Sequence, residues 1–353
     1  MAVAAPTTTP SVARPRTGAL LRSPGARTAG LAAALVVLLA ACAASLAIGS
    51  LDIPLREVWE ALVSRDDTDA HAIVHDLRIP RTELGVLVGG ALGAAGALMQ
   101  GVTRNPLAEP QILGINSGAA LSVVAAISVL GISAPVAYAG FALLGAALAS
   151  VLVYLLGATG RGGATPVKLA LAGAVLTALL TALTSAILVF DAQTLDEFRF
   201  WIVGSIAGRD TEVLTAVAPF MLTGLAIALL CGRSLNALAM GDEVARSLGH
   251  HVDRSRGWAA LGFVLLAGGA VAAAGPIGFV GLTVPHVARA LVGPDYRWVI
   301  PFSIVLGATL LLVGDVAGRV VSRPDELEVG IITALIGAPF FIWLVRRRRL
   351  SEL

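Results

Sequence analysis

Apolar runs of roughly 20 residues recur along most of the chain, with few charged residues inside them. A helix of that length matches the hydrocarbon thickness of a bilayer. Charged residues make up only 14% of the 353 residues, whereas a soluble domain carries about 25%. The sequence therefore predicts an all-α polytopic membrane protein. The ten candidate transmembrane helices lie at approximately 29–49, 82–102, 112–131, 134–157, 167–190, 213–232, 257–274, 276–292, 299–318 and 329–345.

Basic residues fall mostly on one side of these ten spans. If the N-terminus is cytoplasmic, the inner segments hold 17 of the 25 Lys and Arg residues but only six of the 23 Asp and Glu residues. Cytoplasmic loops carry such an excess of basic residues, so both termini are predicted to be cytoplasmic. The expected organisation is a disordered tail at 1–28, a ten-helix transmembrane domain at 29–346 and a cytoplasmic C-terminal tail at 347–353.

The first apolar run allows a second interpretation. The letters LAAC at Leu39–Cys42 resemble a lipoprotein cleavage site at the end of a signal peptide. Ala and Leu dominate every predicted helix, however, so such a match arises easily. We therefore favour an uncleaved first helix.

Small residues recur every four positions in the second predicted helix, at Gly85, Gly89, Gly93 and Ala97. This spacing places them on one helix face and allows a neighbouring helix to approach closely. Packing of the bundle is the favoured interpretation, and contact with a transported substrate is the alternative.

Nothing in the sequence resembles an active site. GATGRGG at 157–163 lacks the Lys-Ser/Thr of a phosphate-binding loop, and neither HExxH nor GxSxG occurs. His71 and His75 allow a metal site, although a solvated outer loop is the simpler interpretation. Cys42 and Cys231 each lie in an apolar run and do not look like a disulfide pair. We predict a protein that is not an enzyme and binds no metal or cofactor itself.

Ionisable residues are scarce in the middle of the predicted spans. A secondary transporter usually carries them there as ion or proton sites. Asp315 is the main exception, and it lies near Arg319 at the outer end, as either a buried salt bridge or a capped helix end. An ion-coupled secondary transporter, the competing class of function, thus lacks its expected residues.

The inner segment 235–257 is the best candidate for contact with a separate energy-supplying subunit. It predicts a short amphipathic helix with acids at its start, where they suit the helix dipole, and a closing glycine. The residues that define it are Gly241, Asp242, Glu243, Ala245, Leu248 and Gly249. A separate ATPase subunit could push on such a helix. A simple helical connector explains the same residues, and a membrane scaffold without transport would not need them.

Four separated stretches resemble the signature motifs of the FecCD family. They are LRIPRTELGVLVGGALGAAGALMQGVTRNPLAEPQILGINSGA, LNALAMGDEVARSLG, GPIGFVGLTVPHVARALVG and ELEVGIITALIGAPFFIWLVRRRR. The family comprises permease subunits of ATP-binding cassette (ABC) importers for ferric siderophores, with haem and cobalamin importers as relatives. The resemblance covers about Pro54 to the C-terminus and is nearest to the ferric-enterobactin type.

The resemblance implies a ten-span fold like that of the cobalamin permease, a type II ABC importer, in a bacterial cell membrane. It implies four kinds of partner: a second permease subunit (a copy or a paralogue), two ATPase subunits that use ATP, an external substrate-binding lipoprotein and membrane lipid. The implied cargo is a ferric siderophore, with haem or cobalamin as alternatives. No nucleic acid partner is expected.

The resemblance also implies roles for particular residues. Arg78, Arg81 and Arg319 resemble outer arginines that receive glutamates of the loaded binding protein, and fixed guanidinium charges suit that docking. The alternative is that they anchor helix ends at the lipid headgroups.

Two further roles lie on the inner side. Asn105, Pro106 and Leu107 match positions that narrow the cytoplasmic exit, and Pro106 bends the chain away from the second helix. The segment from Gly241 to Gly249 resembles the coupling helix that docks in a groove of the ATPase.

Overall fold

The chain forms a bundle of helices, seen here in a computed structural model that describes residues 19–64, 66, 68–132, 134–159 and 165–347. No strand occurs among these residues. The helical elements are α1 (Pro24–Ala47), α2 (Leu55–Val63), α3 (Asp69–Ala72), η1 (Ile73–Arg78), α4 (Ile79–Thr103), η2 (Pro110–Leu113), α5 (Ile115–Leu130), α6 (Pro135–Ala158), α7 (Pro166–Phe190), α8 (Ala192–Ile202), α9 (Thr211–Ala239), α10 (Asp242–Ser247), α11 (Val252–Ala274), α12 (Val280–Val292), α13 (Tyr296–Val321) and α14 (Val329–Arg347).

Ten apolar helices follow the ten predicted segments in order. Within the described residues, seven helices are long and apolar enough to cross a membrane, and α5, α12 and α14 are shorter apolar helices. The all-α membrane fold is thereby confirmed. That all ten helices cross the bilayer stays a prediction, because three of them are shorter than a full span.

The first helix begins earlier than the sequence predicts. Ser23 caps α1 through its hydroxyl, and Pro24 occupies the first turn, where its missing N–H is harmless. Just before it, the Leu21 N–H donates to the Leu291 carbonyl of α12 at 2.8 Å. The later part of the predicted tail is therefore packed against the bundle, whereas residues 1–18 lie outside the described residues, as do 348–353 of the C-terminal tail.

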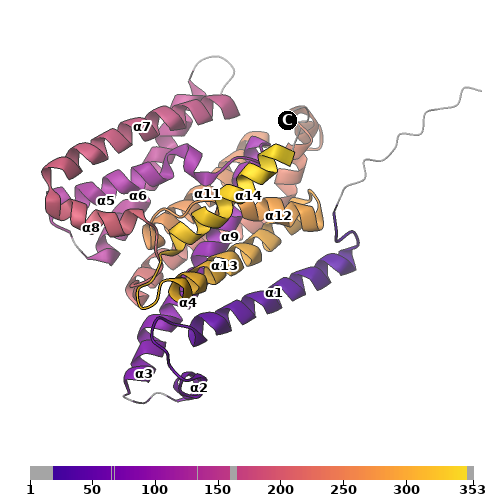
Figure 1. Ribbon diagram of the computed structural model, residues 1–353. Coiled ribbons are helices and arrows are strands. Elements are labelled where there is room, and N and C mark those ends of the chain that lie inside the picture. Colours follow the sequence, from indigo (N-terminus) through magenta and orange to yellow (C-terminus); the bar gives the residue numbers. More distant parts are fainter. Residues whose placement is uncertain (1–18, 65, 67, 133, 160–164, 348–353) are drawn as a thin grey trace, which may run out of the picture.

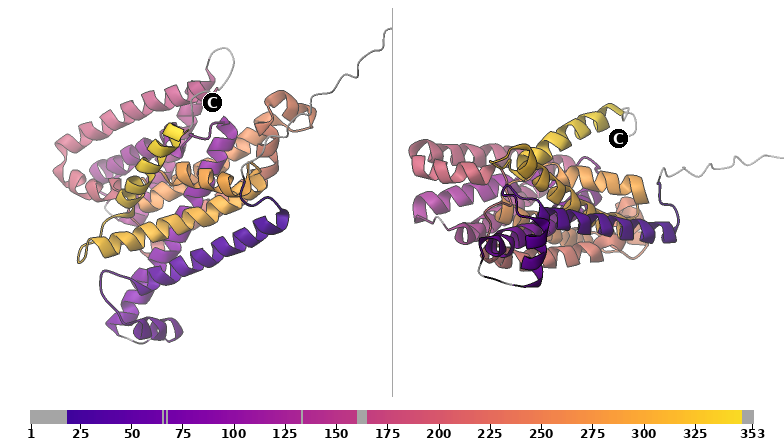
Figure 2. Two further views of the ribbon diagram at one scale, coloured as in Figure 1. Left: turned by 45° about the vertical axis from the view of Figure 1, so that its right-hand side comes forward. Right: turned by 60° about the horizontal axis from the view of Figure 1, so that its bottom comes forward.

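Helix α4 lies at the centre of the bundle, between α1 at one edge and α7 at the opposite edge (Figures 1 and 2). At the usual rise of about 1.5 Å per residue its 25 residues span roughly 37 Å. We call the end at Ile79 the outer end and the end at Thr103 the inner end, after the predicted orientation. Helices α2 and α3 lie at the outer end (Figure 1). Helix α10 lies at the inner end, where its Asp242 pairs with Arg104.

Glycines bring α4 into backbone contact with two neighbours. A methyl group on Gly93 would overlap the carbonyl oxygen of Ser303 in α13, and one on Gly96 would overlap that of Gly281 in α12. Gly89 meets the backbone of Gly307 in the same way. The small-residue face predicted from the sequence thus packs the bundle together.

This packing predicts a position-specific effect of adding one methyl group. Gly93→Ala should lower the free energy of unfolding by about 1–3 kcal/mol, because the core has no space for the methyl group. Gly140→Ala in α6 is the matched control, since open space surrounds that position and alanine favours a helix. Thermal unfolding of the purified protein in detergent measures both, and equal stability of the two variants would contradict the close α4–α13 contact.

Candidate functional site

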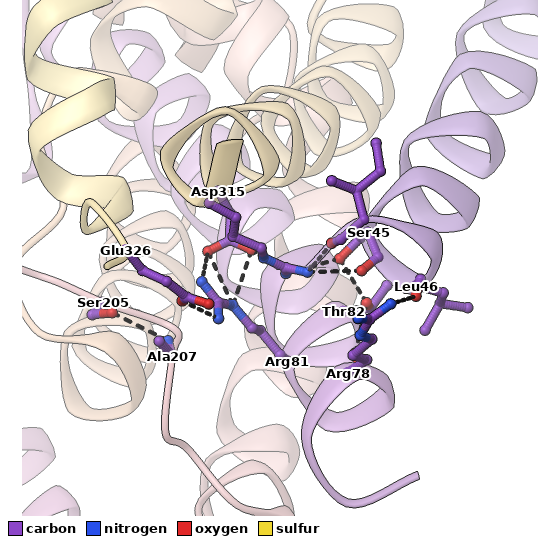
Figure 3. Close-up of polar contacts among 11 residues, drawn as sticks. Ser45, Leu46, Arg78, Arg81, Thr82, Ser205, Ala207, Asp315 and Glu326 are labelled. Atoms are coloured by element: carbon purple, nitrogen blue, oxygen red, sulfur yellow. Dashed lines mark hydrogen bonds and ion pairs between the residues drawn. The ribbon is translucent and has the colours of Figure 1, made fainter. Parts of the chain in front are cut away.

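The outer end holds a buried network of charged side chains (Figure 3). Asp315 of α13 lies at its centre and is only 1% exposed. Arg81 of α4 donates to its Oδ1 at 2.7 Å, and Arg319 pairs with its Oδ2. The open question about Asp315 is therefore resolved in favour of a buried salt bridge, with two arginines sharing one carboxylate.

Arg78 and Arg319 also cap the C-terminal end of α1. Together they donate to five backbone carbonyl oxygens at 2.7–3.0 Å. These carbonyls belong to Ser45, Leu46, Ala47, Ile48 and Leu51. The last carbonyls of a helix have no partner within the helix, so the two guanidinium groups satisfy acceptors that would otherwise be left unpaired inside the protein.

Burial distinguishes Arg78 and Arg319 from freely accessible docking charges. Their exposed fractions are 4% and 1%, and their guanidinium groups already bind acceptors within the protein. Anchoring of a helix end, the alternative interpretation, describes these contacts, although the helix end is anchored to the protein itself. A docking role for the two residues stays a prediction.

Arg81 differs from the other two arginines because part of it reaches the surface. Its side chain is 14% exposed, and its Nη1 donates to Glu326 at 2.6 Å, where Glu326 is 26% exposed. Burial raises the pKa of the Glu326 carboxyl, but the hydrogen bond and charge of Arg81 outweigh burial and lower it. An ionised Glu326 therefore occupies the exposed side of Arg81.

The inner end brings the predicted coupling helix and the predicted gate together. Arg104 ends α4 in a left-handed conformation, with φ of 50°. Its Nε donates to the Leu238 carbonyl at 2.7 Å, and its Nη2 pairs with Asp242 of α10. Arg256 of α11 donates to the same Asp242 oxygen at 3.1 Å. One carboxylate thus joins α4, α10 and α11.

The coupling helix has the start and end that the sequence predicts. Gly241 precedes it with φ of 108°, and Gly249 follows it with φ of 83°, which are conformations that favour glycine. Ala245 is buried against the bundle, whereas Glu243 and Leu248 are exposed. Burial raises the pKa of the adjoining Asp242, but the hydrogen bond from Arg104 and nearby arginine charges lower it below its usual value.

The predicted gate residues follow Arg104 directly. The Asn105 side-chain Oδ1 accepts from the Leu107 N–H at 2.9 Å, which forms a tight turn around Pro106. One peptide bond therefore joins Arg104 to this turn. That the turn narrows a cytoplasmic exit stays a prediction.

Sequence reasoning missed the partner of Glu109. Its Oε1 accepts from the Phe279 N–H at 2.8 Å, at the start of α12, where Phe279 has φ of 67°. Gln100 supports the same helix by donating to the carbonyls of Gly281 and Leu282 at 3.2 and 3.3 Å. A helix cap supplied from 170 residues away leaves no local signal in the sequence. The segment that follows α4, which contains the predicted gate residues, is thereby tied to α12 as well as to α10.

The histidine pair also differs from the expected solvated loop. His75 Nε2 lies 2.7 Å from the Ala61 carbonyl, and His71 Nδ1 accepts from the Asp66 N–H at 3.0 Å. The His75 ring therefore joins η1 to α2, and the His71 ring joins α3 to the segment after α2. No cluster of metal ligands occurs among the described residues.

The chain is similar to transport permeases along nearly its whole length. The sequence model of the FecCD transport family matches residues 37–347 of this chain. Probable siderophore transport system permease protein YfiZ of Bacillus subtilis (strain 168) is 44% identical over 311 residues, which cover 88% of this chain and 93% of the relative. Ferric enterobactin transport system permease protein FepD of Escherichia coli (strain K12) is 43% identical over 314 residues, covering 89% and 94%.

The fold of this chain is also similar to that of a solved transporter structure. It shows a metal-chelate type ABC transporter in an inward-facing conformation, with a TM-score of 0.80 and 29% sequence identity. The match covers 91% of this chain and 100% of that chain.

The outer network predicts a large loss of stability when its central charge is removed. Asp315→Asn keeps the shape but leaves two arginines without their shared carboxylate, and breaking a buried pair costs about 3–5 kcal/mol. Glu60→Gln is the control, because it removes one member of the exposed Arg56–Glu60 pair and should change little. Thermal unfolding in detergent compares them, and an Asp315→Asn variant as stable as the control would refute the structural role of the network.

Proposed function

This chain belongs to the FecCD transport family, and we propose that it carries a ferric siderophore across the cell membrane. It is a permease subunit of an ABC importer and not an enzyme. Partner ATPase subunits use the ATP. YfiZ and FepD are both named for siderophore transport, which supports this cargo over haem or cobalamin. The proposed assembly adds a second permease subunit and an external binding protein.

The Arg104–Asp242 pair is the observation that carries the mechanism. In the proposed orientation, the exposed Glu243 of α10 and the exposed Leu248 directly after it face an ATPase subunit. When the ATPase subunits bind ATP and close, they move α10. The ion pair between Asp242 and Arg104 then moves Arg104 as well. The turn at Asn105–Leu107 moves together with Arg104. ATP on the inside and the loaded binding protein on the outside thus shift the same equilibrium between two states of the permease.

The proposed path for the cargo is apolar. Helix α7 exposes aliphatic side chains every four residues along one face. They are Leu171, Val175, Leu179 and Leu183. A second permease subunit facing this stripe would enclose a path that holds a chelate loosely, and loose binding allows rapid release. The affinity for the cargo then resides in the binding protein.

Reconstituted vesicles test this function. With the ATPase and binding proteins present, the permease should take up a ferric siderophore only when ATP is supplied. Asp242→Asn removes a charged hydrogen bond, typically about 1.5–3 kcal/mol, so uptake per ATP hydrolysed should fall about tenfold or more. The ATPase should still co-purify with this variant, because Glu243 and Leu248 remain on α10.

Two controls sharpen the test. Asp253→Asn, which removes an exposed carboxylate from the start of α11, should leave uptake unchanged. Glu243→Lys should instead weaken co-purification of the ATPase. Normal coupling in Asp242→Asn would refute the proposed lever, and uphill uptake by the permease alone on a proton or sodium gradient would refute the function.

We propose that the binding protein docks by placing a carboxylate on Arg81 in exchange for Glu326. Glu326→Gln removes that competitor and leaves Asp315 in place, so the binding protein should bind about two- to fivefold more tightly, as expected for one partly exposed ion pair. Asp325→Asn is the control in the same loop. Surface plasmon resonance on the permease in nanodiscs measures the affinity, and an unchanged value for Glu326→Gln would exclude Arg81 as the docking residue.

A further inference from the structure

A cavity of about 420 Å³ lies between the inner ends of α9 and α11. Each helix contributes one face, with residues at intervals of three and four. The lining residues are Ile227, Leu230, Cys231 and Ser234 of α9, Gly249 and His250 of the connection, and His251, Arg254, Ser255 and Trp258 at the start of α11. This volume is in the range of small-molecule sites, about 300–1,000 Å³.

The cavity exists because the two helices touch at one level and separate at the next. A methyl group on Gly224 would lie 3.1 Å from the carbonyl oxygen of Gly262, so the backbones are in contact there. Toward the inner end, Ser234 and Ser255 line opposite sides of the cavity. We call this cavity, on the inner side of the Gly224–Gly262 contact, the wedge.

The two ends of the wedge differ in chemistry. Leu230 and Trp258 form its membrane side, and they are 81% and 58% exposed. Arg254 and His251 lie at its inner side, about 6 and 10 Å from Trp258 along α11 at 1.5 Å per residue. None of the lining residues is acidic, and no carboxylate among the described residues pairs with Arg254.

We propose that this wedge binds an anionic phospholipid. The headgroup phosphate would accept hydrogen bonds from Arg254 and the Ser255 hydroxyl, and an acyl chain would cover Leu230 and Trp258. Basic sites between membrane helices on the cytoplasmic side suit such headgroups, and Trp is favoured at the membrane interface. A soluble ligand would leave the apolar side uncovered.

The lipid would also steady the coupling helix. His250 lines the wedge, and its backbone N–H donates to the Ala245 carbonyl of α10 at 3.0 Å. A headgroup in the wedge therefore lies directly behind the element on which the ATPase is proposed to act. The inference rests on the proposed membrane orientation and is independent of the cargo.

Native mass spectrometry of the full-length permease tests the site without any transport assay. The protein is titrated with phosphatidylglycerol or phosphatidylcholine of matched acyl chains. The wild type should bind phosphatidylglycerol about fivefold more tightly, the effect of one arginine near an anionic headgroup. Arg254→Gln should abolish this preference, whereas Arg199→Gln, which removes an exposed arginine from α8 at the outer end, should keep it.

Two further arms distinguish the occupants. Ser255→Phe fills the wedge without changing a charge and should also abolish the preference, while glycerol 3-phosphate at millimolar concentration should not compete with the lipid. A preference that survives both Arg254→Gln and Ser255→Phe would overturn the proposal. Equal competition by glycerol 3-phosphate would overturn it in favour of a soluble anion. If Arg254→Gln or Ser255→Phe abolished co-purification of the ATPase but left the lipid preference unchanged, the proposal would be overturned and the wedge would be assigned to ATPase binding.

Discussion

Charged groups inside a membrane-embedded bundle have to find their partners within the protein, because the hydrocarbon supplies none. The buried outer cluster of this chain follows that constraint, and a second, partly exposed cluster lies at the inner end. At the outer end, Asp315 balances Arg81 and Arg319, and the remaining guanidinium donors close the end of α1. At the inner end, Asp242 balances Arg104 and Arg256. In both places one carboxylate ties together helices that are distant in the sequence.

Helix α4 connects these two clusters physically. It carries Arg81 near its first turn and is followed by Arg104 at its end, so each cluster holds one end of the same helix. Between them, glycine contacts press α4 against α13, which itself carries Asp315 and Arg319. A tightly packed pair of helices moves as a unit rather than bending. The arrangement suits a protein in which events on opposite membrane faces have to be coordinated.

The sequence predicted the local features of this fold well. The apolar runs place all ten apolar helices, because each run is apolar enough by itself to indicate a helix. The glycines on both sides of α10 and its early acids predict a short capped helix at that position. The segment after α4 includes Asn105–Leu107, whose role as a gate stays a prediction. Its contacts with α10 through Arg104 and with α12 through Glu109 were outside the reach of local patterns.

Residue types and spacing alone determined that this chain is a helical membrane protein, since hydropathy and capping act over a few residues. Tertiary structure decided how its charges are used. The sequence predicted a docking role for Arg78 and Arg319, but their burial was decided by the end of α1, more than 25 residues before either, which supplies their acceptors. The pairing of Arg104 with Asp242 likewise depends on two segments 138 residues apart. The partners of these charges are set by how helices pack, and packing is a property of the whole bundle.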